Sequence, residues 1–209
     1  TGEIRGLMQR FNRMASAVME SRRDLESKVQ ERTLALDRLT KTDPLTDILN
    51  RRGMTERMDA QLQPCDGGQT RMGILWLDVD HFKSINDLHG HAVGDEVLVT
   101  IARLIQGELP AVGVASRWGG DEFLVMLAGA GTESLDQLGE GLRHAVARCQ
   151  AVHNALGEAV PLSVSIGGYL CEPGDDLNAV LIKGDDALYS AKAAGRNTYR
   201  AFVPSQTRI

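Results

Sequence analysis

Two adjacent acidic residues follow a pair of glycines in the segment RWGGDEF, residues 117–123. Strand-like apolar stretches flank this segment at residues 112–116 and 123–127. Because glycine reaches positive φ without a Cβ clash, a Gly-Gly pair between two such stretches predicts a tight hairpin turn. The carboxylates of Asp121 and Glu122 would then lie at the tip of the hairpin, where they repel each other unless a cation is bound. An isolated acidic turn is more often plain solvated surface.

A second acidic strand end makes a binding site the better interpretation. Asp78 and Asp80 come directly after the apolar run 73–77, which has the composition of a buried strand. Carboxylates from two strand ends that meet in space can hold a hard divalent cation. We therefore expect a cation site where these two segments meet, with Asp80 in a structural role.

The chain resembles the GGDEF domain, the catalytic domain of diguanylate cyclases, over roughly residues 41 to 203. Several separate motifs carry the resemblance in the family's order: Thr42–Thr46 with Asn50–Arg52, Asp78–Lys83 with Ile85–Asp87, Gly90–His91 with Gly94–Asp95, Arg117–Phe123, Ser165–Gly168, Ala187–Tyr189 with Ala191–Lys192, and Gly195–Asn197. The resemblance implies that two GTP molecules are condensed into cyclic di-GMP with release of two pyrophosphates.

The expected fold is α/β (α+β), a palm-like βαββαβ sheet of the kind that nucleotidyl cyclases and polymerases share. This order of elements predicts an antiparallel sheet with helices on one face. Apolar periodicity and breaker residues place a short helix after residue 50, a strand ending at 78, helices over about 94–106, 135–156 and 177–194, and strands over 160–169 and 198–203.

The resemblance also implies the residues that act on the nucleotide. Attack of a 3′-hydroxyl on an α-phosphate develops charge on nucleophile and leaving group together, which two Mg²⁺ ions can stabilise, and Mn²⁺ could replace them. The implied ligands are the carboxylates of Asp78, Asp121 and Glu122 and the backbone carbonyl of Val79. Asp121 matches the position that activates the 3′-hydroxyl.

The remaining matched positions recognise GTP. Lys83, Lys192 and Arg196 match phosphate-contacting positions, and Lys192 and Arg196 are counted with the catalytic residues. The backbone N–H groups of Phe82 and Lys83 are expected on the β- and γ-phosphates.

Asn86 and Asp95 match the pair that reads guanine. A carboxylate accepts from guanine N1–H and N2–H, groups that adenine lacks, so GTP is the expected substrate.

Two positions depart from the family pattern. Asp47 stands where glycine is usual, and Asp tolerates unusual turn dihedrals better than most residues. The Arg-x-x-Asp pair that binds product in many members aligns with Pro110 and Gly113, so no inhibitory product site is expected there.

Residues 1–40 form a separate unit of the sequence, before the cyclase domain at 41–209. Apolar residues at 4, 7, 11, 14 and 18, and again at 25, 29, 36 and 39, give two coiled-coil seams with a slip between them. The first seam resembles the second helix of a HAMP domain. A single helix packed on its own domain is the alternative. We expect a parallel homodimer, placed in the cytoplasm below the membrane part of an inner-membrane receptor.

Composition limits the function further. The formal net charge of −5 argues against a general nucleic-acid binder, and 43% hydrophobic residues suffice for a core. Two other functions stay open: a degenerate domain that binds nucleotide or a partner without turnover, and a dimerisation module.

Overall fold

The computed structural model of the 209-residue chain describes residue 19, residues 41–62 and residues 71–204. The chain divides into two units, Thr1–Thr40 and Lys41–Ile209. All residues of the predicted coiled-coil seams and of the HAMP resemblance therefore lie outside the described residues, since Met19 belongs to neither seam.

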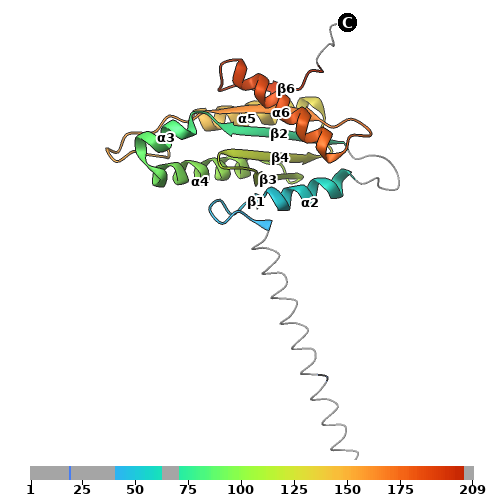
Figure 1. Cartoon of the computed structure of the whole chain (residues 1–209), viewed down its shortest axis with the longest axis horizontal. Coiled ribbons are helices and arrows are strands. Elements are labelled where there is room, and N and C mark those ends of the chain that lie inside the picture. The colour runs from blue at the N-terminus through green and yellow to red at the C-terminus, as the bar shows by residue number, and fades with distance from the viewer. Residues whose placement is uncertain (1–18, 20–40, 63–70, 205–209) are drawn as a thin grey trace, which may run out of the picture. The chain divides into compact units, whose positions relative to one another are not determined.

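The second unit is built around one six-stranded sheet (Figure 1). The elements follow in the order β1 (Leu49–Asn50), α2 (Arg51–Leu62), β2 (Met72–Val79), α3 (Phe82–His89), α4 (His91–Glu108), β3 (Gly113–Arg117), β4 (Glu122–Ala128), α5 (Thr132–Ala147), β5 (Val164–Leu170), α6 (Leu177–Ala193) and β6 (Tyr199–Ala201). The strand order is β1-β3-β4-β2-β5-β6. The four central strands are antiparallel, whereas the short edge strands β1 and β6 pair in parallel with β3 and β5.

Helices cover both faces of this sheet, so the predicted single helical face is wrong. Leu75 and Leu77 of β2 pack in one core cluster with residues of α4 and α5. Ile74 and Trp76 pack in a second cluster with residues of α2 and α6. The physical reason is legible in the sequence, because β2 is an unbroken apolar run from residue 72 to 77 rather than an alternating one.

A helical hairpin, α3 and α4, follows β2 where one helix over 94–106 was expected. Gly90 separates the two helices with φ 87°, and its N–H donates to the carbonyl of Asn86 to end α3. This left-handed conformation suits glycine, so the break depends on a single residue.

The predicted helix 135–156 is too long at its C-terminal end, since α5 ends at Ala147. The next residues form a small turn in which the N–H of Val160 donates to the carbonyl of Val152. Cys149, the last residue of the predicted apolar face, lies just beyond α5 and packs against the core without being helical. None of the described helices is long and apolar enough to cross a membrane.

Candidate active site

Asp78 and Glu122 form the centre of the candidate site. They are direct cross-strand partners at the end of the β2–β4 ladder. Along their strands they share the parity of Trp76 and Leu124, so both carboxylates project on the face that carries α2 and α6. Directly opposed residues have Cβ atoms about 5 Å apart. The pairing register therefore brings together two of the acidic residues that the sequence singled out.

Both carboxyl groups are costly to ionise in this position. Burial raises the pKa of Glu122 above its ordinary value of 4.5, and the neighbouring charge of Asp78 raises it further. Burial also raises the pKa of Asp78, although its bond to Lys192 opposes the shift. Two such groups side by side gain from a cation, which removes their repulsion and favours the ionised form.

Lys192 supplies the nearest positive charge. It lies in the last turn of α6, and its Nζ is 2.6 Å from Oδ2 of Asp78. The Asp78 side chain is 14% exposed and that of Lys192 is 33% exposed, so solvent reaches the pair from the Lys192 side. A phosphate group arriving from that side can therefore reach Lys192.

The hairpin turn that positions Glu122 has a different backbone conformation from the one predicted. The N–H of Trp118 donates to the carbonyl of Glu122 across the turn, and neither Gly119 nor Gly120 has a positive φ. Gly119 is instead required for space, since a Cβ there would lie 2.7 Å from Oε2 of Glu122. Asp121 lies in the turn, and its backbone carbonyl accepts from the N–H of Val79.

The donor set fits a hard divalent cation. Asp78, Glu122 and the turn residue Asp121 offer carboxylate oxygens, which Mg²⁺ prefers, and all three come from adjoining strand ends. Within residues 41–62 and 71–204, no three His, Cys, Asp or Glu side chains are already gathered as a metal site. The protein side therefore brings two carboxylates together, and further ligands would have to come from Asp121, the backbone, water or the nucleotide.

The α3–α4 hairpin lies beyond the end of β2. His81, with φ 57°, turns the chain into α3, so that Phe82 and Lys83 are its first two residues. The first N–H groups of a helix have no partner within it and can bind phosphate oxygens. This local geometry is compatible with the predicted backbone contacts.

The proposed guanine-reading residues lie on facing parts of the two helices. The amide of Asn86 packs so closely on Gly94 that a Cβ there would be 1.9 Å from Oδ1. Asp95, the next residue, is exposed on α4. The glycine thus lets Asn86 approach the start of α4, beside Asp95.

Arg196 is positioned by a buried carboxylate far away in the sequence. Asp80 accepts from the hydroxyls of Ser163 and Ser165 and from the backbone N–H of Asn197. These bonds confirm the structural role expected for Asp80. They fix the loop after α6 in which Arg196, with φ 65°, is exposed.

A second network of hydrogen bonds, which the sequence did not predict, connects the hairpin turn to Asp43 through Arg117. Arg117 donates through Nε and Nη2 to the carbonyl of Gly120, at 3.1 and 2.8 Å. Its Nη1 contacts both carboxylate oxygens of Asp43 at 3.3 Å. Both residues stand in matched motifs, but nothing in their spacing of 74 residues showed that they meet.

Comparison with known proteins decides the family. Residues 40–198 match the family described as "Diguanylate cyclase, GGDEF domain". The chain belongs to the GGDEF family. It is 37% identical over 199 residues to the diguanylate cyclase DgcP of Pseudomonas aeruginosa, covering 94% of this chain and 28% of that protein. It is 32% identical to the diguanylate cyclase TpbB of the same species, covering 99% of this chain and 47% of that protein.

Solved GGDEF structures have the same fold. The coiled coil and GGDEF domain of DgcB from Caulobacter crescentus, in complex with c-di-GMP, superimposes with a TM-score of 0.82 at 28% identity, covering 90% of this chain and 98% of that one. The GGDEF domain of TpbB gives 0.70 at 34% identity, covering 78% and 94%. The present chain spans less than half of the length of the two curated relatives named above.

The two departures from the GGDEF pattern take clear structural forms. Asp47 adopts φ 56°, so the prediction that the turn survives with Asp in place of glycine is confirmed. Pro110 lies in the loop after α4, and Gly113 is the first residue of β3; the N–H of Gly113 donates to the carbonyl of Pro110. They line a surface hollow of about 450 Å³ with Asp47, and neither contributes a charged side chain to it.

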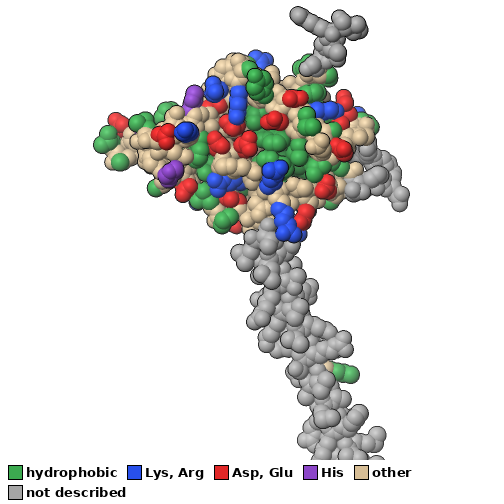
Figure 2. All heavy atoms as spheres, viewed as in Figure 1, with side chains coloured by type: hydrophobic (Ala, Val, Ile, Leu, Met, Phe, Trp, Pro, Cys, Tyr) green, Lys and Arg blue, Asp and Glu red, His purple; other side chains and the backbone are tan. Residues whose placement is uncertain are grey.

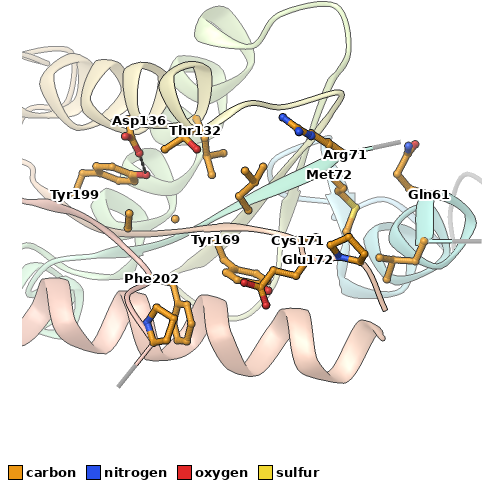
Figure 3. Close-up of a pocket in the computed structure, with 17 residues that line it drawn as sticks. Gln61, Arg71, Met72, Thr132, Asp136, Tyr169, Cys171, Glu172, Tyr199 and Phe202 are labelled. Carbon is orange, nitrogen blue, oxygen red and sulfur yellow. Dashed lines mark hydrogen bonds between the residues drawn. The ribbon is translucent and has the colours of Figure 1, made fainter. Parts of the chain in front are cut away.

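A larger cavity of about 550 Å³ lies at the opposite end of the sheet from Asp78 (Figure 3). Met72, the first residue of β2, lines it, together with Tyr169, Tyr199 and Phe202. The hydroxyl of Tyr199 is bonded to Asp136 in its wall. Because β2 runs from this cavity to the carboxylates, the cavity is no part of the GGDEF site.

Proposed function

We propose that the protein is a diguanylate cyclase that condenses two GTP molecules into cyclic di-GMP and releases two pyrophosphates. The observation that carries the proposal is the half-buried pair Asp78 and Glu122, beside Lys192, in a chain of the GGDEF family. The diguanylate cyclase relatives support the activity, and the cyclic di-GMP complex of DgcB supports the product.

The carboxylates would act together on the reacting phosphate. Asp78, Glu122 and the carbonyl of Val79 are proposed to hold Mg²⁺, or Mn²⁺ in its place, and two such ions would supply charge stabilisation at the attacked α-phosphate and the leaving pyrophosphate. Asp121, in the turn beside them, accepts the proton of the attacking 3′-hydroxyl. Its side chain is partly exposed, so a nucleotide can reach it.

Cationic and amide groups would bind the rest of GTP. Lys192, whose Nζ lies 2.6 Å from Asp78, would bind one phosphate oxygen, and Arg196 would bind a second phosphate. The N–H groups of Phe82 and Lys83, with the Lys83 ammonium, bind the terminal phosphates.

The choice of base is assigned to the α3–α4 hairpin. Asn86 and Asp95 accept and donate on the edge of guanine. Adenine would leave the Asp95 carboxylate without its donors, so ATP should be rejected.

One domain offers one nucleotide site, whereas the product contains two nucleotides. We therefore propose that two chains face each other, each with one GTP, and that residues 1–40 form the parallel coiled coil that sets their geometry. A HAMP relay upstream, in an inner-membrane receptor, would bias that geometry. Insertions between residues 18 and 25 should then alter activity with a period of about seven residues.

Incubation of the purified protein with GTP and Mg²⁺ tests the central proposal. We expect cyclic di-GMP and two equivalents of pyrophosphate, no product with ATP, and loss of activity with a chelator. A folded protein that binds GTP at the same Mg²⁺ concentration without forming cyclic di-GMP would instead be a degenerate, nucleotide-binding GGDEF domain.

A further inference from the structure

Arg51, the first residue of α2, is a cation beside the site that the proposed mechanism leaves without a role. Its guanidinium carbon lies 4.9 Å from the centre of the Trp118 ring, above one of its faces. The Trp118 ring in turn meets Trp76 edge-on, with centroids 5.6 Å apart. The guanidinium is thus held by a ring that is itself fixed in the core.

The ring that carries Arg51 belongs to the same row as the carboxylates. Trp118 lies opposite Glu122 across the hairpin, and Glu122 lies opposite Asp78 in the next ladder. All three side chains project on the face of α2 and α6. Figure 2 shows acidic and basic groups around an apolar area on one face of the molecule. Adjacent strands are about 4.8 Å apart, so Trp118 and Asp78 are separated by roughly 10 Å.

Arg51 and Lys192 therefore flank the carboxylate pair from opposite sides. Lys192 approaches from α6 and already contacts Asp78. Arg51 approaches from α2, and no carboxylate of the described residues lies within ion-pair distance of it. The Arg51 side chain is exposed.

The position of Arg51 is unfavourable for helix stability. Two arginines and no acidic residue occupy the first turn of α2, where the helix dipole favours negative charge. Arg52 is compensated by Glu56 one turn later, at 3.3 Å. Among residues 41–62 and 71–204, Arg51 has no such carboxylate partner. The helix dipole of α2 disfavours the Arg51 charge, and the guanidinium is exposed above the Trp118 ring. An exposed guanidinium held in this way can bind an anion that is not part of the domain.

We propose that Arg51 binds the second nucleotide of the condensation, the one delivered by the facing copy of the chain. This inference rests on the proposed cyclase function. The domain's own triphosphate is assigned to Lys192 and Arg196, on α6 and the loop after it, and to the start of α3, beyond the end of β2, whereas Trp118 lies in the β3–β4 hairpin. The anion that reaches the α2 side is then the phosphate that becomes part of the new phosphodiester, and a guanidinium can bind two of its oxygens.

The test compares Arg51→Ala with Arg52→Ala, a neighbouring arginine whose charge is already paired. Two quantities are measured in each variant: the affinity for α,β-methylene GTP, which occupies one site but cannot be condensed, and kcat for cyclic di-GMP synthesis. For Arg51→Ala we expect unchanged affinity, within about threefold, and a kcat lower by about 10- to 100-fold, the loss typical of a hydrogen-bonded charge. Arg52→Ala should match the wild type in both.

Other outcomes would overturn the inference. Wild-type kcat in Arg51→Ala would show that the guanidinium does not act in the condensation. An affinity for α,β-methylene GTP that falls as much as kcat would assign Arg51 to the domain's own nucleotide. Arg51→Lys, which keeps the charge but loses the planar fork, should recover part of kcat, and it serves as the folded comparison if Arg51→Ala unfolds. A wild-type protein that forms no product would refute the cyclase function itself.

Discussion

Replacing Glu122 by Gln should stabilise the metal-free protein while it lowers the rate of turnover by about 100-fold. The substitution keeps the size of the side chain but removes one of two like charges that face each other across β2 and β4. At about 5 Å and an effective dielectric constant of 20, their repulsion is about 3 kcal/mol. Glu122 is half-exposed and Lys192 offsets part of the charge, so we expect a net gain of about 1 kcal/mol in the free energy of unfolding.

The pH dependence of stability also predicts that Glu122→Gln stabilises the protein. The pKa of Glu122 is raised in the folded state, so between 4.5 and that raised value the folded protein binds more protons than the unfolded chain. Wild-type stability is therefore highest below pH 4.5, as far as Glu122 is concerned, and this contribution is lost as the pH rises through the raised pKa. The Gln variant lacks this loss, so its advantage should appear at neutral pH and vanish in acid.

Thermal unfolding in the presence of a chelator at several pH values checks the stability prediction. Cyclic di-GMP synthesis measured with Mg²⁺ checks the activity prediction. A gain of about 1 kcal/mol corresponds to a Tm increase of roughly 2–4 °C for a domain of this size. Loss of about 3 kcal/mol of transition-state stabilisation corresponds to about 100-fold in rate. Glu108→Gln, at the exposed end of α4, controls for the loss of a negative charge elsewhere. Near-normal Mg²⁺-dependent synthesis by folded Glu122→Gln would refute the metal assignment, and a lower Tm at neutral pH would refute the repulsion argument.

Three further expectations follow from the same structure. Gly94→Ala should raise KM for GTP by about tenfold, because its Cβ would displace the amide of Asn86, whereas Gly107→Ala in the same helix meets no atom within 4 Å and should leave KM unchanged. Asp43→Asn should lower the free energy of unfolding in urea by about 1–2 kcal/mol. Burial raises the pKa of Asp43, but hydrogen bonds from Thr46 and the charge of Arg117 outweigh this effect and hold the pKa below 3.8. The greater stability of the wild type should therefore disappear as the pH falls below 3.8. Synthesis with pyrophosphatase present should stay linear as product accumulates, because the loop before β3 carries no charged pair, and strong non-competitive inhibition by micromolar cyclic di-GMP would reveal a different product site.

Local patterns in the sequence were enough for the strands that carry the site. The apolar run before Asp78 and the two runs around Gly119 and Gly120 predicted β2, β3 and β4. Pairing then follows from the hairpin, because its turn fixes the register of β3 on β4. The register of β4 on β2, which sets Glu122 opposite Asp78, is a long-range choice that no local pattern specifies.

The missed features depend on side chains that meet only in the folded protein. The prediction that Gly119 is needed for a positive φ is wrong. Glycine is needed at this position because a side chain would collide with the carboxylate of Glu122. The order of elements predicted helices on one face of the sheet only, whereas the unbroken apolar run in β2 indicates that both faces are covered. The contact of Lys192 with Asp78 could be expected only from the family resemblance, since α6 reaches the site through its packing on β5 and β2.

The end of β2 explains why a cluster of like charges survives in this fold. Val79 is buried in the core cluster on one side of the strand, and Asp80 is bonded to two serines and the loop after α6. These contacts fix the backbone immediately after Asp78, and the β2–β4 ladder holds Asp78 opposite Glu122. The repulsion is therefore retained in the folded state, where a divalent cation relieves it. Under the proposed function this repulsion would favour binding of a cation, and the same repulsion makes Glu122→Gln stabilising.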